Sequence, residues 1–421
     1  MSESRGITLI ILIITIVVLI ILAGVIISNI TSDEGVLQEA SYERDKTKIA
    51  SEEAVLGNVA IEETDKFGDI TEEGLRTALS KYNVEITPSG GLYRIVFKDS
   101  NNLYKMNHQG EFFYWEDMAP TDIYAKKDGT TLYLRSTPQN GYTKGTRWTY
   151  SSVTKIVIEE PIAPSTCYLM FNRFSSLKEI ENIENLHTEN VTDMSSMFYN
   201  CGIQSLNLNY FDTSKVEDMN TMFYACPNLE SLYINNWDTH SNKTMKNMFR
   251  SCTKLKNLDL SNFDTRNVST MERVFQECGS LTSLNLSNFD TTKVNTMQSM
   301  FSCCSSLKIL DLSSFNTNIV TNMEEMFYQN TNLQILDISH FNTSIVTDMS
   351  SMFRACSNLT TIYASNQFNA ENVGDTVMMF SYSSNLVGGN GTKYSSSKTN
   401  GTYARIDAPG IPGYFTLKTN N

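Results

Sequence analysis

Hydrophobic positions in the C-terminal half of the chain recur with a regular 26-residue period. Large apolar side chains mark the same place in each unit, at Phe211, Trp237, Phe263, Phe289, Phe315, Phe341 and Phe368, with Leu186 at that place in a degenerate first unit. The successive spacings from Phe211 onward are 26, 26, 26, 26, 26 and 27. A period of this length indicates a solenoid, because one unit cannot bury its own apolar face whereas stacked units share a core.

Each unit contains two kinds of local pattern. Leu258-Asp259-Leu260 alternates apolar and polar positions, as in a short strand with one buried face, and Phe263 follows as a large buried anchor. The spacing expected of a short helix or helical turn then occurs at Val268, Met271, Val274 and Phe275. The sequence therefore predicts a solenoid of about seven to eight 26-residue units over residues 166–385.

The amino terminus carries an uninterrupted apolar segment. No charged residue occurs from position 6 to position 27, and residues 7–27 as a helix would be about 32 Å long, enough to cross a bilayer core of about 30 Å. Arg5 precedes this segment and two acidic residues follow it, so we expect the bulk of the chain to lie outside the cell. The pattern predicts a transmembrane helix over residues 7–27 and a single-pass protein of the cell membrane.

The start of this segment, Arg5-Gly6-Ile7-Thr8-Leu9-Ile10, resembles the cleavage site of type IV prepilins, specifically of the pilin-like proteins of Gram-positive bacteria. The resemblance implies a leader at residues 1–6, cut after Gly6 by a prepilin peptidase, with Ile7 as the first mature residue. It also implies the pilus machinery as a partner and a pilus-like filament as a location. The family usually has glutamate at the fifth mature position, where this chain has Ile11. An uncleaved membrane anchor is the alternative.

Residues 28–120 are expected to form a stalk helix and a small β head. Tyr42, Ile49 and Leu56 recur seven apart, which predicts that an amphipathic helix continues outward from the membrane. We expect a turn at Pro88-Ser89-Gly90-Gly91, and further elements at a short helix over residues 71–82 and strands over residues 92–97 and 102–106. A long helix followed by a small antiparallel sheet resembles a pilin-type head. Residues 121–165 would then be a cap or linker before the solenoid.

The order of strand, FDT, VxxM, MF and C within each unit resembles the BspA-like leucine-rich repeat surface proteins. The match covers about residues 166–385, and residues 386–421 resemble that family's terminal segment and would cap the solenoid. The resemblance implies an extracytoplasmic protein that binds host surfaces, neighbouring cells or matrix proteins. The predicted fold class is thus α+β, with a membrane and stalk helix, a pilin-like sheet and a leucine-rich repeat solenoid.

Composition changes this picture in two respects. The chain has 33 basic and 46 acidic residues, a formal charge of -13, so it lacks the basic field that nucleic-acid binding requires. Its eight cysteines do not resemble a disulfide framework, because six of them share one place in the repeat, at Cys201, Cys226, Cys252, Cys278, Cys304 and Cys356. Side chains in one column point the same way and cannot pair, so we expect buried free thiols, with Cys167 and Cys303 outside the column.

We find no constellation of side chains that predicts catalysis, a metal site or a cofactor. One repeated column of Asp and Asn, from Asp212 to Asn342, leaves calcium open as an alternative to a backbone role in turns. The best functional surface is the outward side of the strands, which would bind a host or neighbouring-cell surface protein or glycan, although an ordinary solvated face has the same pattern. Its candidate residues are Asn207, Tyr233, Asn235, Asp259, Asn285, Asp311, Asp337 and Tyr363.

These patterns support two functions. The first is a membrane-tethered adhesion or binding protein that presents the solenoid. The second is a minor pilin-like subunit of a type IV filament that carries the solenoid as a display domain. An enzyme acting on polysaccharide would need paired carboxylates in a cleft, which the sequence does not indicate.

Overall fold

The computed structural model describes residues 48–60 except 50, residue 63, residues 70–115 with gaps at 90–91, 101 and 108–111, and residues 121–418 with gaps at 146–147, 149 and 371–372. The chain divides into two compact units, residues 1–59 and residues 60–421. Gly6, Ile7 and the predicted membrane helix over residues 7–27 lie outside the described residues. In the parts that are described, no helix combines the length and apolar character that crossing a membrane requires.

In the first unit, residues 51–59 are helical, within the span where the heptad pattern predicts a helix. The second unit begins with a small α+β element. Helix α3, Glu72–Ala78, starts at Thr71, whose hydroxyl accepts a hydrogen bond from the Gly74 amide at 3.1 Å. It is shorter than the helix predicted over residues 71–82.

Four strands form an antiparallel sheet in chain order: β1 (Val84–Ser89), β2 (Leu92–Phe97), β3 (Asn102–Asn107) and β4 (Phe112–Trp115). The two strands predicted at 92–97 and 102–106 are confirmed as β2 and β3. The turn expected to begin at Pro88 is wrong in part, because Pro88 and Ser89 pair with Tyr93 and Leu92 at the end of β1. A proline is tolerated there because β1 is an edge strand.

Residues 121–181 form a second sheet, which starts the stack. Its strands are β5 (Tyr124–Asp128), β6 (Thr131–Arg135), β7 (Thr143–Lys144), β8 (Lys155–Ile158) and β9 (Glu179–Glu181), in the spatial order β7-β5-β6-β8-β9. The β5–β6 pair is an antiparallel hairpin, whereas β6, β8 and β9 run parallel, one strand per turn. Leu132, Leu134 and Ile156 are fully buried, so this sheet covers the amino-terminal end of the solenoid core.

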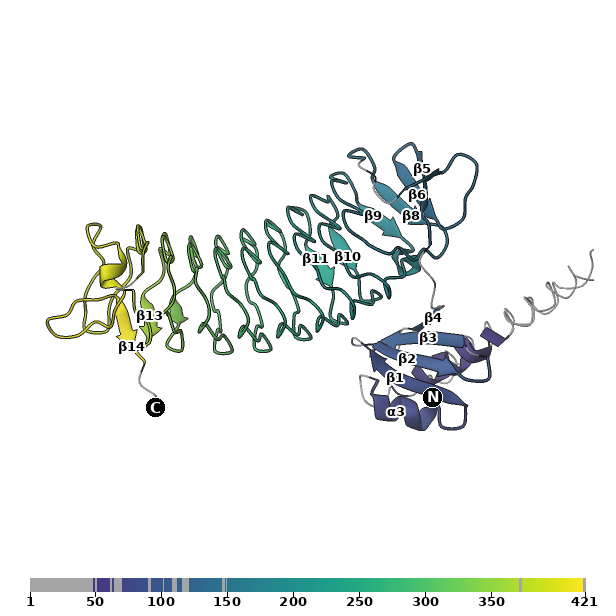
Figure 1. The fold of residues 1–421 in the computed structure, drawn as a ribbon, viewed down its shortest axis with the longest axis horizontal. Coiled ribbons are helices and arrows are strands. Elements are labelled where there is room, and N and C mark those ends of the chain that lie inside the picture. The colour runs from purple at the N-terminus through teal and green to yellow at the C-terminus, as the bar shows by residue number, and fades with distance from the viewer. Residues whose placement is uncertain are drawn as a thin grey trace, which may run out of the picture. The chain divides into compact units, whose positions relative to one another are not determined.

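The predicted solenoid is confirmed (Figure 1). One buried aromatic from each turn stacks on the next in a single column: Phe171, Phe198, Phe223, Phe249, Phe275, Phe301, Phe327, Phe353 and Phe380. Neighbouring ring centroids are 5.5–6.0 Å apart. The column has nine rings. The described solenoid therefore has nine turns, more than the seven to eight units predicted. The second aromatic column, which includes Phe263 and Phe289, is also buried, as its spacing predicts.

One side of the solenoid carries short parallel strands. β10 (Ser205–Asn207) pairs with β11 (Ser231–Tyr233), and β12 (Ile335–Asp337) pairs with β13 (Thr361–Ala364). Residues 255–313, all of them described, contain no assigned strand, but their burial still alternates. Asp259 is exposed between the buried Leu258 and Leu260, for example. The expected strand at Leu258-Asp259-Leu260 thus has the predicted burial without the strand pairing.

The opposite segment of each turn is not helical, and the helix or helical turn predicted from Val268, Met271, Val274 and Phe275 is wrong. These four side chains are buried, but the backbone forms successive turns with two left-handed residues, Arg273 (φ 56°) and Glu277 (φ 62°). The amides of Met271, Arg273, Phe275 and Glu277 donate to carbonyls of the next turn at 2.8–3.1 Å. Because the next turn supplies these acceptors, the backbone does not need the hydrogen bonds that a helix makes within itself.

The cysteine column is confirmed as buried and free. Each thiol from Cys226 onward also donates to the carbonyl of the phenylalanine in the preceding turn, as Cys278 Sγ does to Phe249 O at 3.1 Å. Asn330 and Ser383, which take the cysteine's place in two turns, donate to the equivalent carbonyls of Phe301 and Phe353. The column therefore requires a small donor, which explains why an amide or a hydroxyl substitutes for the thiol.

The carboxyl-terminal segment closes the stack. Strand β14 (Phe415–Leu417) adds in parallel to β13, pairing Phe415 with Ile362. The Asp407 carboxylate holds the loop at Asn390 and Thr392 in place. It accepts hydrogen bonds from the amides of these two residues at 2.8 and 2.9 Å and from the Thr392 hydroxyl at 2.7 Å. Two short 3-10 helices, Ile183–Asn185 and Gly401–Tyr403, complete the described elements of the solenoid and its ends.

Candidate binding surface

Seven of the eight predicted binding residues occupy one position in seven consecutive turns. They form the central column, defined as Asn207, Tyr233, Asp259, Asn285, Asp311, Asp337 and Tyr363. Strand pairing places Asn207 opposite Tyr233 and Asp337 opposite Tyr363. The eighth residue, Asn235, lies two positions beyond Tyr233 and is half-buried. The structure therefore brings the predicted residues together on one side of the solenoid.

The acidic and amide members of the central column have a structural role of their own. An oxygen of each accepts the backbone amide two residues later, closing the corner where the strand segment ends. The distances are 3.2 Å from Asn207 Oδ1 to Asn209 N, 3.0 Å from Asp259 Oδ1 to Ser261 N and 2.9 Å from Asp311 Oδ1 to Ser313 N. The hydrogen bonds from Ser313 lower the pKa of Asp311, which is therefore ionised at neutral pH.

The carboxyl-terminal end of the column is partly occupied by the chain itself. Lys418, directly after β14, donates its Nζ to Asp337 Oδ2 at 2.6 Å and lies 5.0 Å from the centre of the Tyr363 ring. Burial alone would raise the pKa of Asp337, but the hydrogen bonds from Lys418 and Ser339 outweigh burial and lower it. The part of the column without this internal partner runs from Asn207 to Asp311.

Two exposed isoleucines on this surface were missed by the sequence interpretation. Ile309 is 76% exposed and Ile335 is 54% exposed, at the position two residues before the central column. Serine or asparagine stands there in the turns at Ser205, Ser231, Asn257 and Ser283. Strict alternation already places positions 309 and 335 outward, so the change from a small polar residue to isoleucine was a signal available in the sequence. The strand face, defined as the central column and these two isoleucines, is less uniformly polar than predicted.

The repeated Asp and Asn column from Asp212 to Asn342, which the sequence allows to be a calcium site, has a clear backbone role. Asp264 Oδ1 accepts the amide of Arg266 at 3.1 Å, Asp290 Oδ1 that of Thr292 at 2.9 Å, and Asn316 Oδ1 that of Asn318 at 3.0 Å. The turn role predicted for this column is confirmed, and asparagine fills it as well as aspartate. Within the described ranges, no three His, Cys, Asp or Glu side chains gather so that they could hold a metal ion.

Comparison with known proteins identifies a family for the repeat region. Residues 165–284, 202–308 and 269–394 each match the family model described as "Mycoplasma protein of unknown function, DUF285". Together these segments span residues 165–394, more than half of the chain. No curated protein matches the chain.

Solved structures with a detectable likeness include two leucine-rich repeat proteins and a chain of the Toll–Spatzle complex. A leucine-rich repeat protein from Eubacterium ventriosum is 14% identical, with 75% of this chain and 96% of that chain covered and a TM-score of 0.27. The T. pallidum leucine-rich repeat protein is 13% identical, with 60% and 85% covered and a TM-score of 0.19. A chain of the Drosophila Toll–Spatzle complex is 14% identical, with 76% and 42% covered and a TM-score of 0.23.

Proposed function

The chain belongs to the DUF285 family, described as Mycoplasma protein of unknown function, and we propose that it is a cell-surface binding protein that recognises a protein or glycan through its strand face. In this proposal the apolar segment at residues 7–27 anchors the chain in the cell membrane, with the solenoid outside. The BspA-like order of residues in each repeat supports a role in adhesion. The activity is binding rather than a chemical reaction.

The observation that carries the proposal is the combination of side chains on the strand face. Tyr233, Ile309 and Ile335 are 49%, 76% and 54% exposed, on a surface whose other members are mostly carboxylates and amides. Exposed large side chains among hydrogen-bonding groups are the usual anchors of a binding surface, because burying them releases water while the polar groups fix orientation. Asp259 and Asp311 give this surface an acidic character, which favours a partner with basic or hydroxyl groups.

Substitution of the two anchors tests the proposal. Cells that produce the full chain would be applied to a panel of immobilised matrix proteins and glycans. Y233A and I309S are each expected to weaken adhesion at least tenfold to the protein or glycan that the parent binds. The matched control is I319S. Ile319 is 43% exposed but lies beyond the strand segment of its turn, so its loss should leave adhesion unchanged. Equal adhesion by the parent, Y233A and I309S would rule out the strand face as the binding surface.

A pilin-like subunit is the second candidate. Its support is the prepilin-like run from Arg5 to Ile10 together with the antiparallel sheet β1–β4 that follows the helical residues 51–59. Intact-mass spectrometry of sheared filaments discriminates between the two. A mature chain that starts at Ile7 in the filament fraction would support the pilin-like subunit, whereas an uncleaved chain found only in membranes would exclude it.

A further inference from the structure

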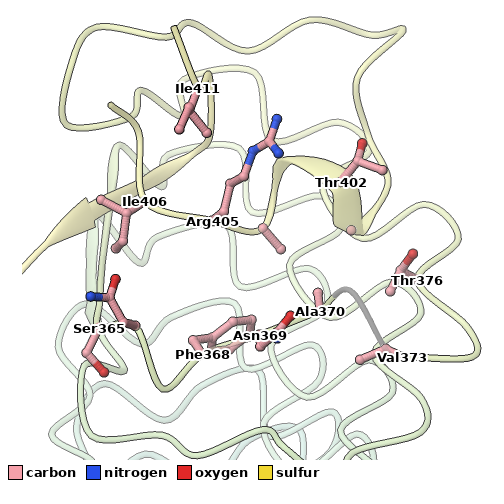
Figure 2. A pocket seen from close by; sticks show the side chains of 13 residues that line it. Ser365, Phe368, Asn369, Ala370, Val373, Thr376, Thr402, Arg405, Ile406 and Ile411 are labelled. Carbon is pink, nitrogen blue, oxygen red and sulfur yellow. The ribbon is translucent and has the colours of Figure 1, made fainter. Parts of the chain in front are cut away.

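A pocket of about 580 Å³ lies between the last turns of the solenoid and the carboxyl-terminal segment. Its lining includes Ser365, Phe368, Val373 and Thr376 on one side and Thr402, Arg405, Ile406 and Ile411 on the other (Figure 2). This volume is within the range of small-molecule sites in proteins. None of the residues that line it belongs to the strand face, so a ligand bound here would be additional to the partner proposed for that surface.

The repeat is altered where it meets this pocket. Asp337 and Tyr363 keep the usual 26-residue spacing, but the step from Phe341 to Phe368 is one residue longer. The additional residue therefore lies between Tyr363 and Phe368, in the corner that supplies Ser365 and Asn366 to the pocket wall. The pocket is a feature of this one turn rather than a groove repeated along the stack.

Arg405 is the one charged group among the described residues that line the pocket. Its Nε donates to the carbonyl of Pro412 at 3.0 Å, which fixes the guanidinium plane. Neither Nη atom has a hydrogen bond or an ion pair in the described parts of the chain. Figure 2 shows Arg405 between Ile411 and Thr402, across the pocket from Phe368 and Asn369. An unpaired guanidinium held in this way is suited to a carboxylate, which can accept two parallel hydrogen bonds from it.

The remaining lining combines free polar groups with apolar surface. The Asn366 amide and the Thr376 hydroxyl have no hydrogen-bond partner among the described residues, so both are available to a ligand. Ile411, which is 52% exposed, and the partly buried Ile406 supply apolar surface beside them. Such a mixture suits a sugar ring, whose hydroxyls form hydrogen bonds while its C–H face contacts apolar side chains.

The walls of the pocket are held in place by close packing. A Cβ on Gly401 would lie 2.6–2.8 Å from the side chain of Thr376, so glycine is needed for the two walls to approach. On the same wall as Gly401, the buried Asp407 anchors the backbone next to Ile406 through its hydrogen bonds to Asn390 and Thr392. The wall that carries Gly401 and Ile406 is therefore preorganised, which lowers the cost of ligand binding.

We propose that this pocket binds a sugar acid, a uronic or sialic acid present as a free sugar or a glycan terminus, with its carboxylate paired to Arg405. The sugar hydroxyls contact Asn366, and the ring lies against Ile406 and Ile411. A neutral sugar of the same shape lacks the partner for Arg405 and binds much more weakly.

Calorimetric titration of the full chain with glucuronate, N-acetylneuraminate and glucose tests this assignment. We expect saturable binding of at least one of the two acids, with an affinity at least tenfold above that of glucose. R405Q should weaken this binding tenfold or more. The matched control K393Q removes the same charge from an exposed residue of the same segment outside the pocket and should bind like the parent.

The outcomes that would overturn the proposal are equally specific. They are no binding of either acid, equal binding of glucose and glucuronate, or unchanged affinity in R405Q. Thermal melting checks that each variant is folded, and if R405Q is unfolded, N366A takes its place, with an expected loss of threefold to tenfold. Y233A on the strand face should leave sugar-acid binding unchanged, so the pocket and the strand face can fail separately.

Discussion

The Thr291 hydroxyl is hydrogen-bonded twice to the backbone of Asn316 in the next turn, donating to its carbonyl at 2.8 Å and accepting from its amide at 2.7 Å. The same pair of bonds recurs along the buried threonine column, which consists of Thr239, Thr265, Thr291, Thr317 and Thr343. Each of these threonines is at most 2% exposed. The repeated Asp-Thr or Asn-Thr thus has a turn-forming first residue and a second residue that links one turn to the next.

Replacing Thr291 with valine should destabilise the solenoid by about 2 kcal/mol or more, because valine has the same shape but leaves the Asn316 amide and carbonyl buried without partners. The control is T292V, because Thr292 is exposed and, in the described part of the chain, its hydroxyl bonds only to Asp290; we expect a change within about 0.5 kcal/mol. Urea denaturation of the two variants measures the difference, and equal stabilities would contradict a role of the Thr291 hydroxyl between turns.

The left-handed positions predict an unusual response to glycine. Ala355 has φ 59° and lies two residues after Phe353, where the apolar spacing that predicts a helix ends in this turn. In a helix, alanine to glycine costs about 1 kcal/mol. In the observed left-handed conformation, A355G should instead be neutral or stabilising, because glycine has no Cβ to clash. A364G, in strand β13, is the control and should be destabilising. A355G as costly as A364G in thermal melting would contradict the left-handed conformation of Ala355.

Only one thiol of the native chain should react readily. Cys303 is half-buried, whereas the other seven cysteines are fully buried. Burial raises the pKa of Cys278 and of its neighbours in the column, so they are thiols rather than thiolates at neutral pH. Burial also raises the pKa of Cys303, so its reaction should accelerate as the pH rises through the alkaline range. A dithionitrobenzoate assay should detect about one fast thiol, absent in C303S; two or more fast thiols in C303S would contradict a buried column.

The carboxyl-terminal segment should loosen on acidification because of Asp407. Burial alone would raise the pKa of this carboxyl, but its hydrogen bonds to Thr392, Gly413 and Asn390 lower it. A pKa below the unfolded value of about 3.9 means that the stabilisation is complete above that pH and is lost as the pH falls through the folded-state pKa. D407N should therefore increase hydrogen exchange in residues 386–415 at pH 7, with a smaller difference from the parent at pH 3. The same difference at both pH values would show that the Asp407 charge is not responsible.

The regular recurrence of one aromatic per repeat was sufficient to predict the solenoid, its buried anchors and its outward column. It was not sufficient for the backbone around Phe275, because apolar residues at i, i+3, i+6 and i+7 suit both a helix and a series of stacked turns. Glycine would have marked the left-handed positions, but Arg273 and Glu277 occupy them. Contacts between segments that are distant in the sequence could not be predicted either. The ion pair of Asp337 and Lys418 joins residues 81 apart, and no repeat pattern relates the two.

The columns that link successive turns also limit how the length of this protein can change during evolution. Duplication or deletion of a whole repeat unit keeps the ring, threonine and cysteine columns aligned, so the gene can gain or lose turns between the same two ends. An insertion within a unit displaces every column after it unless a corner absorbs it. The single additional residue before Phe368 lies in such a corner. The corners are therefore the places where new sequence, and with it new specificity, can enter an otherwise fixed repeat.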